Sequence, residues 1–275
     1  MKDSIEIINL VPRFLDFYGK AKGCDGERRF ETWKKHYGFA AVPPGEEGEV
    51  LAKELLDSAW DKYERIIPFL EQWSPDAERI EQHLSKIKSA LNFSESVDVA
   101  LIFFVGAFDE NAFAAPYGKN RIAVCLPIEN GENQVTVVHE LTHLVHGKII
   151  GSAMNWERSV ASLIFQEGLA TQLSKYLVPG HKDEVYVEHQ EGWLQDCSRD
   201  SKQILQGIRP FLQECSAEKI FQFTMGNGTT GRTREGYFAG WKLIGDMLDN
   251  GWSFSDIARV KEDEMASVLM KACSF

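Results

Sequence analysis

The chain has 275 residues, of which 44% are hydrophobic, a proportion that is ordinary for a protein able to bury a core. Its formal net charge is -11 at pH 7, and an acidic surface argues against nucleic acid or an anionic membrane as the main partner. The first residues lack the apolar stretch of a signal peptide, and no window approaches the roughly 18 apolar residues of a membrane span.

The first 95 residues are expected to form a helical N-terminal region. Apolar residues recur at helical spacing over 46–73, and a second helix is predicted over 76–91, after the break at Ser74-Pro75. A Pro-Pro-Gly run at 43–45 separates this helical pair from the helices before it.

The segment that follows is typical of a sheet. Residues 97–105 (VDVALIFFV) are rich in β-branched and aromatic side chains and predict a strand. A second strand is expected over 120–128, introduced by a turn at 117–120. Pro127 has no amide hydrogen to donate, so this second strand is expected to lie at a sheet edge or to end there.

After Asn130-Gly131 the pattern becomes helical and largely remains so. The expected helices are 133–147, 155–177, 190–206, 208–223, 235–250 and 254–271. Neighbours in sequence tend to be neighbours in space, so the two strands are expected to form a small sheet that packs on the 133–147 helix. The predicted fold class is α+β, mainly helical.

The 133–147 helix contains the sequence HELTH. His139 and His143 lie about one turn apart on the same face, so both imidazoles can reach one metal ion. Glu140 lies about 100° around the helix, where its carboxylate can reach a water beside that ion. The flanking residues are apolar, which is typical of a buried helix. The alternative is a pair of core histidines bonded to backbone carbonyls.

A catalytic zinc site needs a third protein ligand, because it takes three side chains and one water. Glu167 is the best candidate, since it lies on an otherwise apolar helical stripe where an unpaired charge would be very costly. The alternative for Glu167 is an ion pair with a buried Lys or Arg. Glu157 is a weaker candidate, because it falls near the first turn of its helix. His146 lies about 10.5 Å along the axis from His139, which is too far to share an ion comfortably.

These motifs resemble the gluzincin metallopeptidases, in which a second helix supplies a glutamate within an EGxA sequence, here Glu167 in FQEGLAT. The metzincin pattern would need a histidine at position 149, which is Ile149. The order of strands, HExxH, EGLA and a GYxxG segment at 236–240 is similar to the bacterial YjaZ-like family of predicted zinc-dependent proteases. The resemblance implies a zincin-like metallopeptidase region over 96–275, with a helical C-terminal part and Zn²⁺ as cofactor.

With zinc to activate a water and Glu140 as general base, the predicted function is hydrolysis of peptide bonds. The resemblance also implies an edge strand that holds an extended substrate and a distal Tyr or His that assists the oxyanion. Tyr237 is the candidate donor to the oxyanion, with Arg234 and His146 behind it, and a core tyrosine is the alternative. The strand at 121–126 is the candidate for pairing with substrate, and an ordinary edge strand is the alternative. The candidate substrate-binding residues are therefore Arg234, His146, Ala123 and Val124.

Two other functions compete with peptidase activity. A non-catalytic, zinc-stabilised binding module would keep the ligands, but an intact Glu140 argues against a purely structural site. The glycine-rich run 226–233 resembles a phosphate-binding loop with Arg232 in the lysine position, although such a loop needs a preceding strand and the lysine itself. A flexible loop that borders the active site is the favoured interpretation of this run.

The five cysteines are odd in number and form no CxxC pair, which is typical of free thiols in a reducing compartment. The sequence does not choose between endopeptidase and exopeptidase activity, and it predicts no oligomeric state. The free thiols predict a cytoplasmic protein, and the metal motif predicts a peptide or protein substrate as its partner.

Overall fold

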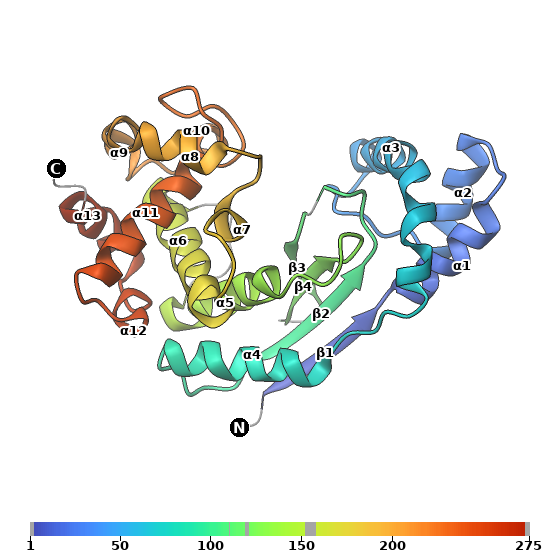
Figure 1. The fold of residues 1–275 in the computed structure, drawn as a ribbon, viewed down its shortest axis with the longest axis horizontal. Coiled ribbons are helices and arrows are strands. Elements are labelled where there is room, and N and C mark those ends of the chain that lie inside the picture. Colours follow the sequence, from blue (N-terminus) through green and yellow to red (C-terminus); the bar gives the residue numbers. More distant parts are fainter. Residues whose placement is uncertain (1–2, 110, 119–120, 152–157, 273–275) are drawn as a thin grey trace. The chain divides into compact units, whose positions relative to one another are not determined.

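The computed structural model describes residues 3–109, 111–118, 121–151 and 158–272 (Figure 1). It is mainly helical and has a small four-stranded mixed sheet, so the predicted α+β class is confirmed. The chain forms two compact units, one of Met1–Glu81 with Glu95–Val137 and the other of Gln82–Ser94 with Val138–Phe275. Each unit therefore combines segments from both sides of the predicted boundary between residues 95 and 96.

The first unit contains the sheet and the first three helices. Its elements are β1 (Ser4–Asn9), α1 (Val11–Ala21), α2 (Gly26–His36), α3 (Glu46–Leu70), β2 (Asp98–Phe104), β3 (Phe113–Tyr117) and β4 (Arg121–Pro127). Helices α4 (Ala77–Ala90) and α5 (Gln134–Ile150) begin in this unit and continue into the second. The predicted long helices at 46–73 and 76–91 correspond closely to α3 and α4.

The expectation that the first 95 residues are wholly helical is wrong at β1. This strand pairs in parallel with β2, with Ser4 opposite Asp98 and Asn9 opposite Phe103. Its sequence, SIEIIN, is short and only partly buried, so its own pattern is weak. The partner strand lies far along the chain, and a local window of sequence cannot register such a pairing.

The second predicted strand was expected either to lie at a sheet edge or to end at Pro127, and the structure confirms the second alternative. The strand order is β1-β2-β4-β3, so β4 lies inside the sheet and β3 lies at its edge. Pro127 is tolerated because it is the last residue of β4, where the ladder ends. The unpredicted edge strand β3 has the sequence FAAPY, whose alanines and proline are poor strand formers, and it is held by antiparallel pairing with β4.

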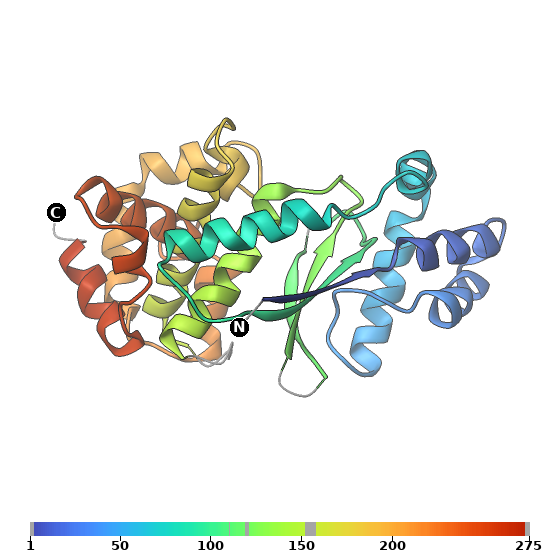
Figure 2. The same cartoon turned by 90° about the horizontal axis from the view of Figure 1, so that it is seen from below.

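Two buried tyrosines join the helices of the first unit to the end of β2. The Tyr37 hydroxyl donates to the Val105 carbonyl at 3.0 Å and accepts from the Val105 amide at 2.8 Å. The Tyr63 hydroxyl donates to the Gly106 carbonyl at 2.9 Å. These bonds satisfy backbone groups where the ladder stops, and α1, α2 and α3 gather beyond that end of the sheet (Figure 2).

The second unit is helical throughout its described part. Its further elements are α6 (Val160–Leu177), α7 (Glu184–Val187), α8 (Trp193–Arg199), α9 (Ser201–Ile208), the 3₁₀ turn η1 (Arg209–Phe211), α10 (Ala217–Thr224), α11 (Glu235–Asp249), α12 (Phe254–Ile257) and α13 (Glu262–Ala272). The predicted helices at 190–206, 208–223 and 254–271 are each broken into shorter pieces. Ser159 begins α6 by accepting from the amide of Ser162 at 3.0 Å.

Helix α6 is buried along most of its length and forms the centre of the second unit, with α11 as its closest neighbour. The two helices approach so closely that a Cβ atom at Gly168 would lie 2.4 Å from the Gly240 carbonyl oxygen. A Cβ atom at Gly240 would lie 2.5 Å from the Ile164 carbonyl oxygen. Glycine at both positions is therefore a requirement of this packing, not of backbone conformation.

None of the helices in the described part of the chain is long and apolar enough to cross a membrane. Three of the described cysteines are free thiols: Cys24, Cys197 and Cys215. The packing of the sheet on the His139–His143 helix stays a prediction.

We predict that Gly168→Ala destabilises the protein by about 1–3 kcal/mol, because the new methyl group would overlap backbone atoms of α11. Gly19→Ala is the matched control, since this exposed glycine of α1 has open space around its Cβ position. Alanine is the better helix former there, so the control should be neutral or up to about 1 kcal/mol more stable. Urea denaturation measures both free energies of unfolding. Equal stability of Gly168→Ala and the wild type would contradict the close helix contact.

Candidate metal centre

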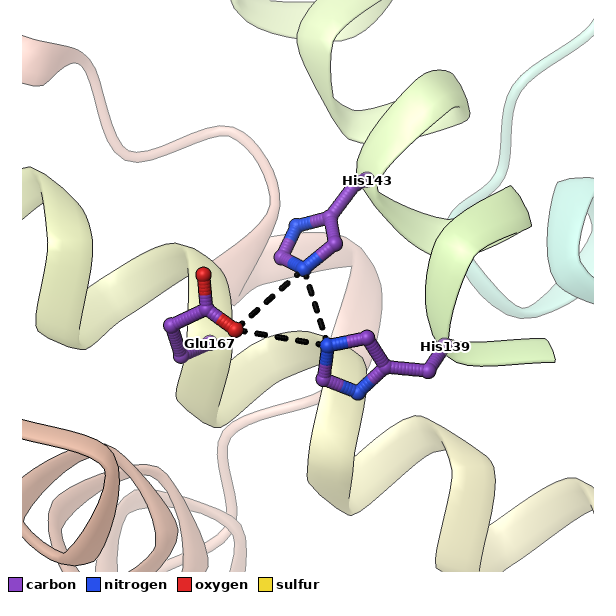
Figure 3. A group of neighbouring side chains, drawn as sticks. All are labelled: His139, His143 and Glu167. Atoms are coloured by element: carbon purple, nitrogen blue, oxygen red, sulfur yellow. Dashed lines mark hydrogen bonds and ion pairs between the residues drawn. The ribbon is translucent and has the colours of Figure 1, made fainter. Parts of the chain in front are cut away.

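Three side chains from two helices converge in the second unit (Figure 3). His139 and His143 come from α5, and Glu167 comes from the middle of α6. The Nε2 atoms of the two histidines lie 3.0 Å apart. Oε2 of Glu167 lies 3.3 Å from Nε2 of His139 and 3.4 Å from Nε2 of His143. The structure thus brings together the three residues that the sequence predicted as ligands, and this group could hold a metal ion.

The triangle of ligand atoms has the dimensions of a tetrahedral metal site. Zinc bonds of about 2.0–2.1 Å at tetrahedral angles place neighbouring ligand atoms about 3.3–3.4 Å apart. The two contacts with Glu167 fall in this range, and the contact between the histidines is slightly shorter. The donor set of two imidazoles and one carboxylate is that of a catalytic zinc site, which leaves a fourth position to water.

The ligands are electrostatically coupled before any metal binds. Burial opposes the charge on His139, but the hydrogen bond and negative charge of Glu167 outweigh it and raise the pKa of His139. Burial likewise opposes ionisation of Glu167, and the two histidines outweigh it, so the pKa of Glu167 is lowered well below its usual value. A metal ion would displace the proton of His139, so metal binding should weaken as the pH falls.

Arg158 occupies the other face of the Glu167 carboxylate. Its Nη2 atom lies 3.5 Å from Oε1 of Glu167, and its Nη1 atom donates to Oε1 of Gln166 at 2.6 Å. The two carboxylate oxygens therefore have different partners, with Oε1 toward Arg158 and Oε2 toward the histidines. An ion pair between Glu167 and an arginine was the alternative to metal ligation, and the ion pair with Arg158 at Oε1 leaves Oε2 beside the two histidines.

Glu140 lies between the two histidine ligands in sequence and is half-buried. Its negative charge contributes to the raised pKa of His139. Within the described residues, no hydrogen bond or ion pair holds the Glu140 carboxylate.

Tyr237 and Arg234 lie at the start of α11. The charge of Glu167, together with burial, raises the pKa of Tyr237 to about 12, so its hydroxyl keeps its proton at neutral pH and can donate it in a hydrogen bond. The Arg234 guanidinium carbon lies 4.1 Å from the centre of the Tyr237 ring. Its positive charge opposes protonation of His139 and thereby moderates the rise in the pKa of His139.

The structure gives the other candidate substrate residues structural partners. His146 is 1% exposed, and burial, followed by the charge of His143, lowers its pKa to about 4 despite a hydrogen bond with the backbone of Ala258. A neutral, enclosed ring of this kind is a core residue. Ala123 and Val124 are paired on both sides, with β2 and with β3, so their backbone does not form the open edge that strand addition needs. Glu157 lies outside the described residues.

The glycine-rich run is held in place by a buried carboxylate. Glu235 is fully buried and accepts from the amides of Thr229 and Thr230, each at 2.8 Å, and from both hydroxyls. The segment before the run is α10, a helix, so the strand that a phosphate-binding loop requires is missing. The Glu235 carboxylate therefore occupies the position at which these amides could bind a phosphate. Its four hydrogen bonds hold the glycine-rich loop in place.

Sequence reasoning missed two residues of this site. Arg158 lies just before α6 and belongs to no recognisable motif. Its position eight and nine residues before Gln166 and Glu167 was the one signal in the sequence that it could be their partner. Glu235 stands beside the GYxxG segment and gave no signal, because its partners are polar loop residues without periodicity.

Comparison of the chain with protein-family models, with characterised proteins and with solved structures finds no match. The interpretation of the site rests on its own geometry.

We predict that Glu167→Ala lowers zinc affinity by more than the roughly 10–100-fold typical of an outer partner of a ligand, because it removes a ligand itself. The fold should persist with a lower free energy of unfolding, because the variant removes the cost of burying Glu167 but leaves Arg158 without its ion pair. Competition with a chromophoric chelator measures the affinity, and circular dichroism checks the fold.

Glu218→Ala serves as the control for this variant, because it removes an exposed carboxylate from α10. Stoichiometric zinc bound to Glu167→Ala with unaltered affinity would show that Glu167 is not a ligand.

Proposed function

We propose that this chain is a zinc-dependent peptidase of the gluzincin type, with His139, His143 and Glu167 as the zinc ligands. The observation that carries the proposal is the convergence of three ligand atoms at 3.0–3.4 Å, with Glu140 directly after the first histidine and without an ion pair to any described residue. Bound there, Zn²⁺ would lower the pKa of an attacking water toward about 7 and polarise the scissile carbonyl. The protein would act in the cytoplasm on a peptide or protein substrate.

Glu140 acts as the general base. It takes a proton from the attacking water as the oxygen of that water bonds to the carbonyl carbon, and it returns the proton to the nitrogen as the carbon–nitrogen bond breaks. This role needs a carboxylate near the ligands that no cation already holds. Glu140 meets both conditions, whereas Glu167 is held by three cationic or hydrogen-bonding partners.

Tyr237 donates a hydrogen bond to the developing oxyanion. Its raised pKa keeps the hydroxyl protonated throughout the neutral range, as a donor requires. Its ring packs beside the apolar cluster of Trp193, Leu194, Cys197, Ile204 and Phe238, which fixes its orientation. Arg234, stacked on the same ring, adds a positive charge on this side of the site.

The rival function is a binding module that uses zinc only for stability. A structural zinc site is usually closed by a fourth protein ligand. Within the described residues, the group of potential ligands contains only His139, His143 and Glu167. This open donor set favours catalysis, and peptide hydrolysis by the wild type distinguishes the two functions directly.

We expect Glu140→Gln to keep its zinc and its thermal stability but to lose nearly all peptide hydrolysis, because the amide has the same size and is no base. Zinc content by elemental analysis, the melting temperature and the rate of cleavage of a mixed peptide library measure the three properties. Glu262→Gln, at an exposed position of α13, is the control. Wild-type rates in Glu140→Gln would rule out this mechanism, and a zinc-loaded wild type that cleaves nothing would favour the binding module.

Tyr237→Phe should have a milder effect, because it removes one donor and leaves the nucleophile intact. The expected cost is roughly 2.7–4 kcal/mol of transition-state stabilisation, or about 10²–10³-fold in rate. The loss should appear in kcat more than in KM, because the hydrogen bond forms in the transition state. Steady-state kinetics on one cleaved peptide measures both constants. An unchanged kcat would identify Tyr237 as a core tyrosine only.

A further inference from the structure

Three arginines of the second unit have different partners. Arg158 forms an ion pair with Glu167 at 3.5 Å. Arg232 forms ion pairs with Asp196 at 3.1 Å and with Asp200 at 2.6 Å. Arg234 has no ion pair with any carboxylate of the described residues, and its Nε atom is shielded from solvent without a hydrogen-bond partner. Among the described residues, the partner of this half-buried guanidinium is Tyr237, through its ring and its hydroxyl, so an anion could bind Arg234 without breaking an ion pair of these residues.

The backbone holds Arg234 in an unusual conformation. Its φ of 57° lies in the left-handed region, which costs free energy for a residue with a side chain. The surroundings enforce it, because Glu235 is locked by its four bonds to the loop and Gly236 lies against the Phe223 carbonyl. Strain of this kind is typical of functional positions, and here it aims the guanidinium over the Tyr237 ring.

The same packing brings Arg234 toward the metal ligands. Helix α11 crosses α6 where Gly240 meets Gly168, the residue next to Glu167. The first turn of α11, with Tyr237, therefore lies alongside the preceding turns of α6, where Gly236 contacts Leu163.

We propose that Arg234 binds a carboxylate of the substrate, so that the enzyme prefers peptides with a carboxylate close to the scissile bond. This inference rests on the proposed peptidase function. A guanidinium presents paired N–H groups that match a carboxylate, and its charge is permanent. The carboxylate comes either from the free C-terminus of the peptide or from an acidic side chain, and both present the same group to Arg234.

The test compares matched peptides on the zinc-loaded full chain. One pair differs only in a C-terminal acid or amide, and a second pair, amidated at the end, differs only in Glu or Gln beside the cleaved bond. Hydrogen bonds to charged groups contribute about 1.5–3 kcal/mol, which corresponds to about 10–100-fold in kcat/KM. We expect the wild type to prefer the acidic peptide of one pair over its neutral partner by that factor. Arg234→Gln should lose this preference, and Arg234→Lys should keep part of it. Preference within the first pair identifies the C-terminus, and preference within the second identifies a side chain.

Arg209→Gln is the control for charge, because it removes an exposed arginine elsewhere in the second unit and should keep the preference. Binding of the same peptides to zinc-loaded Glu140→Gln and to Glu140→Gln with Arg234→Gln, measured by calorimetry, gives a readout that does not depend on turnover. A wild type that binds the acidic peptide selectively but cleaves nothing would refute the peptidase function and keep the carboxylate site. Equal affinity for acid and amide, equal weakening of both by Arg234→Gln, or no binding of either would overturn the inference.

Discussion

Glu167, in the middle of α6, is only 5% exposed, and its buried negative charge is the constraint on which the rest of the site depends. Removing an ionised carboxylate from water costs several kcal/mol unless its oxygens find partners. The protein divides the task, with Arg158 at one oxygen and two imidazoles at the other. Arg158 satisfies one oxygen, and so the other remains available to a metal ion shared with the histidines.

The partners of this carboxylate depend on how closely two helices approach. Glycine at positions 168 and 240 allows the backbones of α6 and α11 to touch, and side chains there would push the helices apart. That contact brings the first turn of α11, with Tyr237 and Arg234, toward Glu167. The buried carboxylate of Glu235 then holds the loop that leads into this turn. Its bonds to the loop amides therefore help to position Arg234 and Tyr237.

The parts of the structure that the sequence predicted are those determined by local spacing. His139 and His143 follow from the helical repeat, Glu167 from a charge on an apolar stripe, and β2 from composition. The parts it missed depend on distant partners. The strand β1 exists because it pairs with β2, and β4 is interior because the weak strand β3 folds onto it. Arg158 and Glu235 likewise acquire their roles only through contacts that the folded chain creates.

The net charge of the whole chain differs from the charge near His139, His143 and Glu167, where two guanidinium groups offset two carboxylates. The Debye length at physiological ionic strength is about 8 Å, so most of the acidic surface is screened from a ligand at the centre. Close to the ligands, the carboxylates are those of Glu140 and Glu167, and the guanidinium groups of Arg158 and Arg234 oppose them. A divalent cation added to this set leaves a net positive centre with one arginine unpaired. The acidity of the chain as a whole is therefore no argument against an anionic ligand at this site, because local charges outweigh screened distant ones.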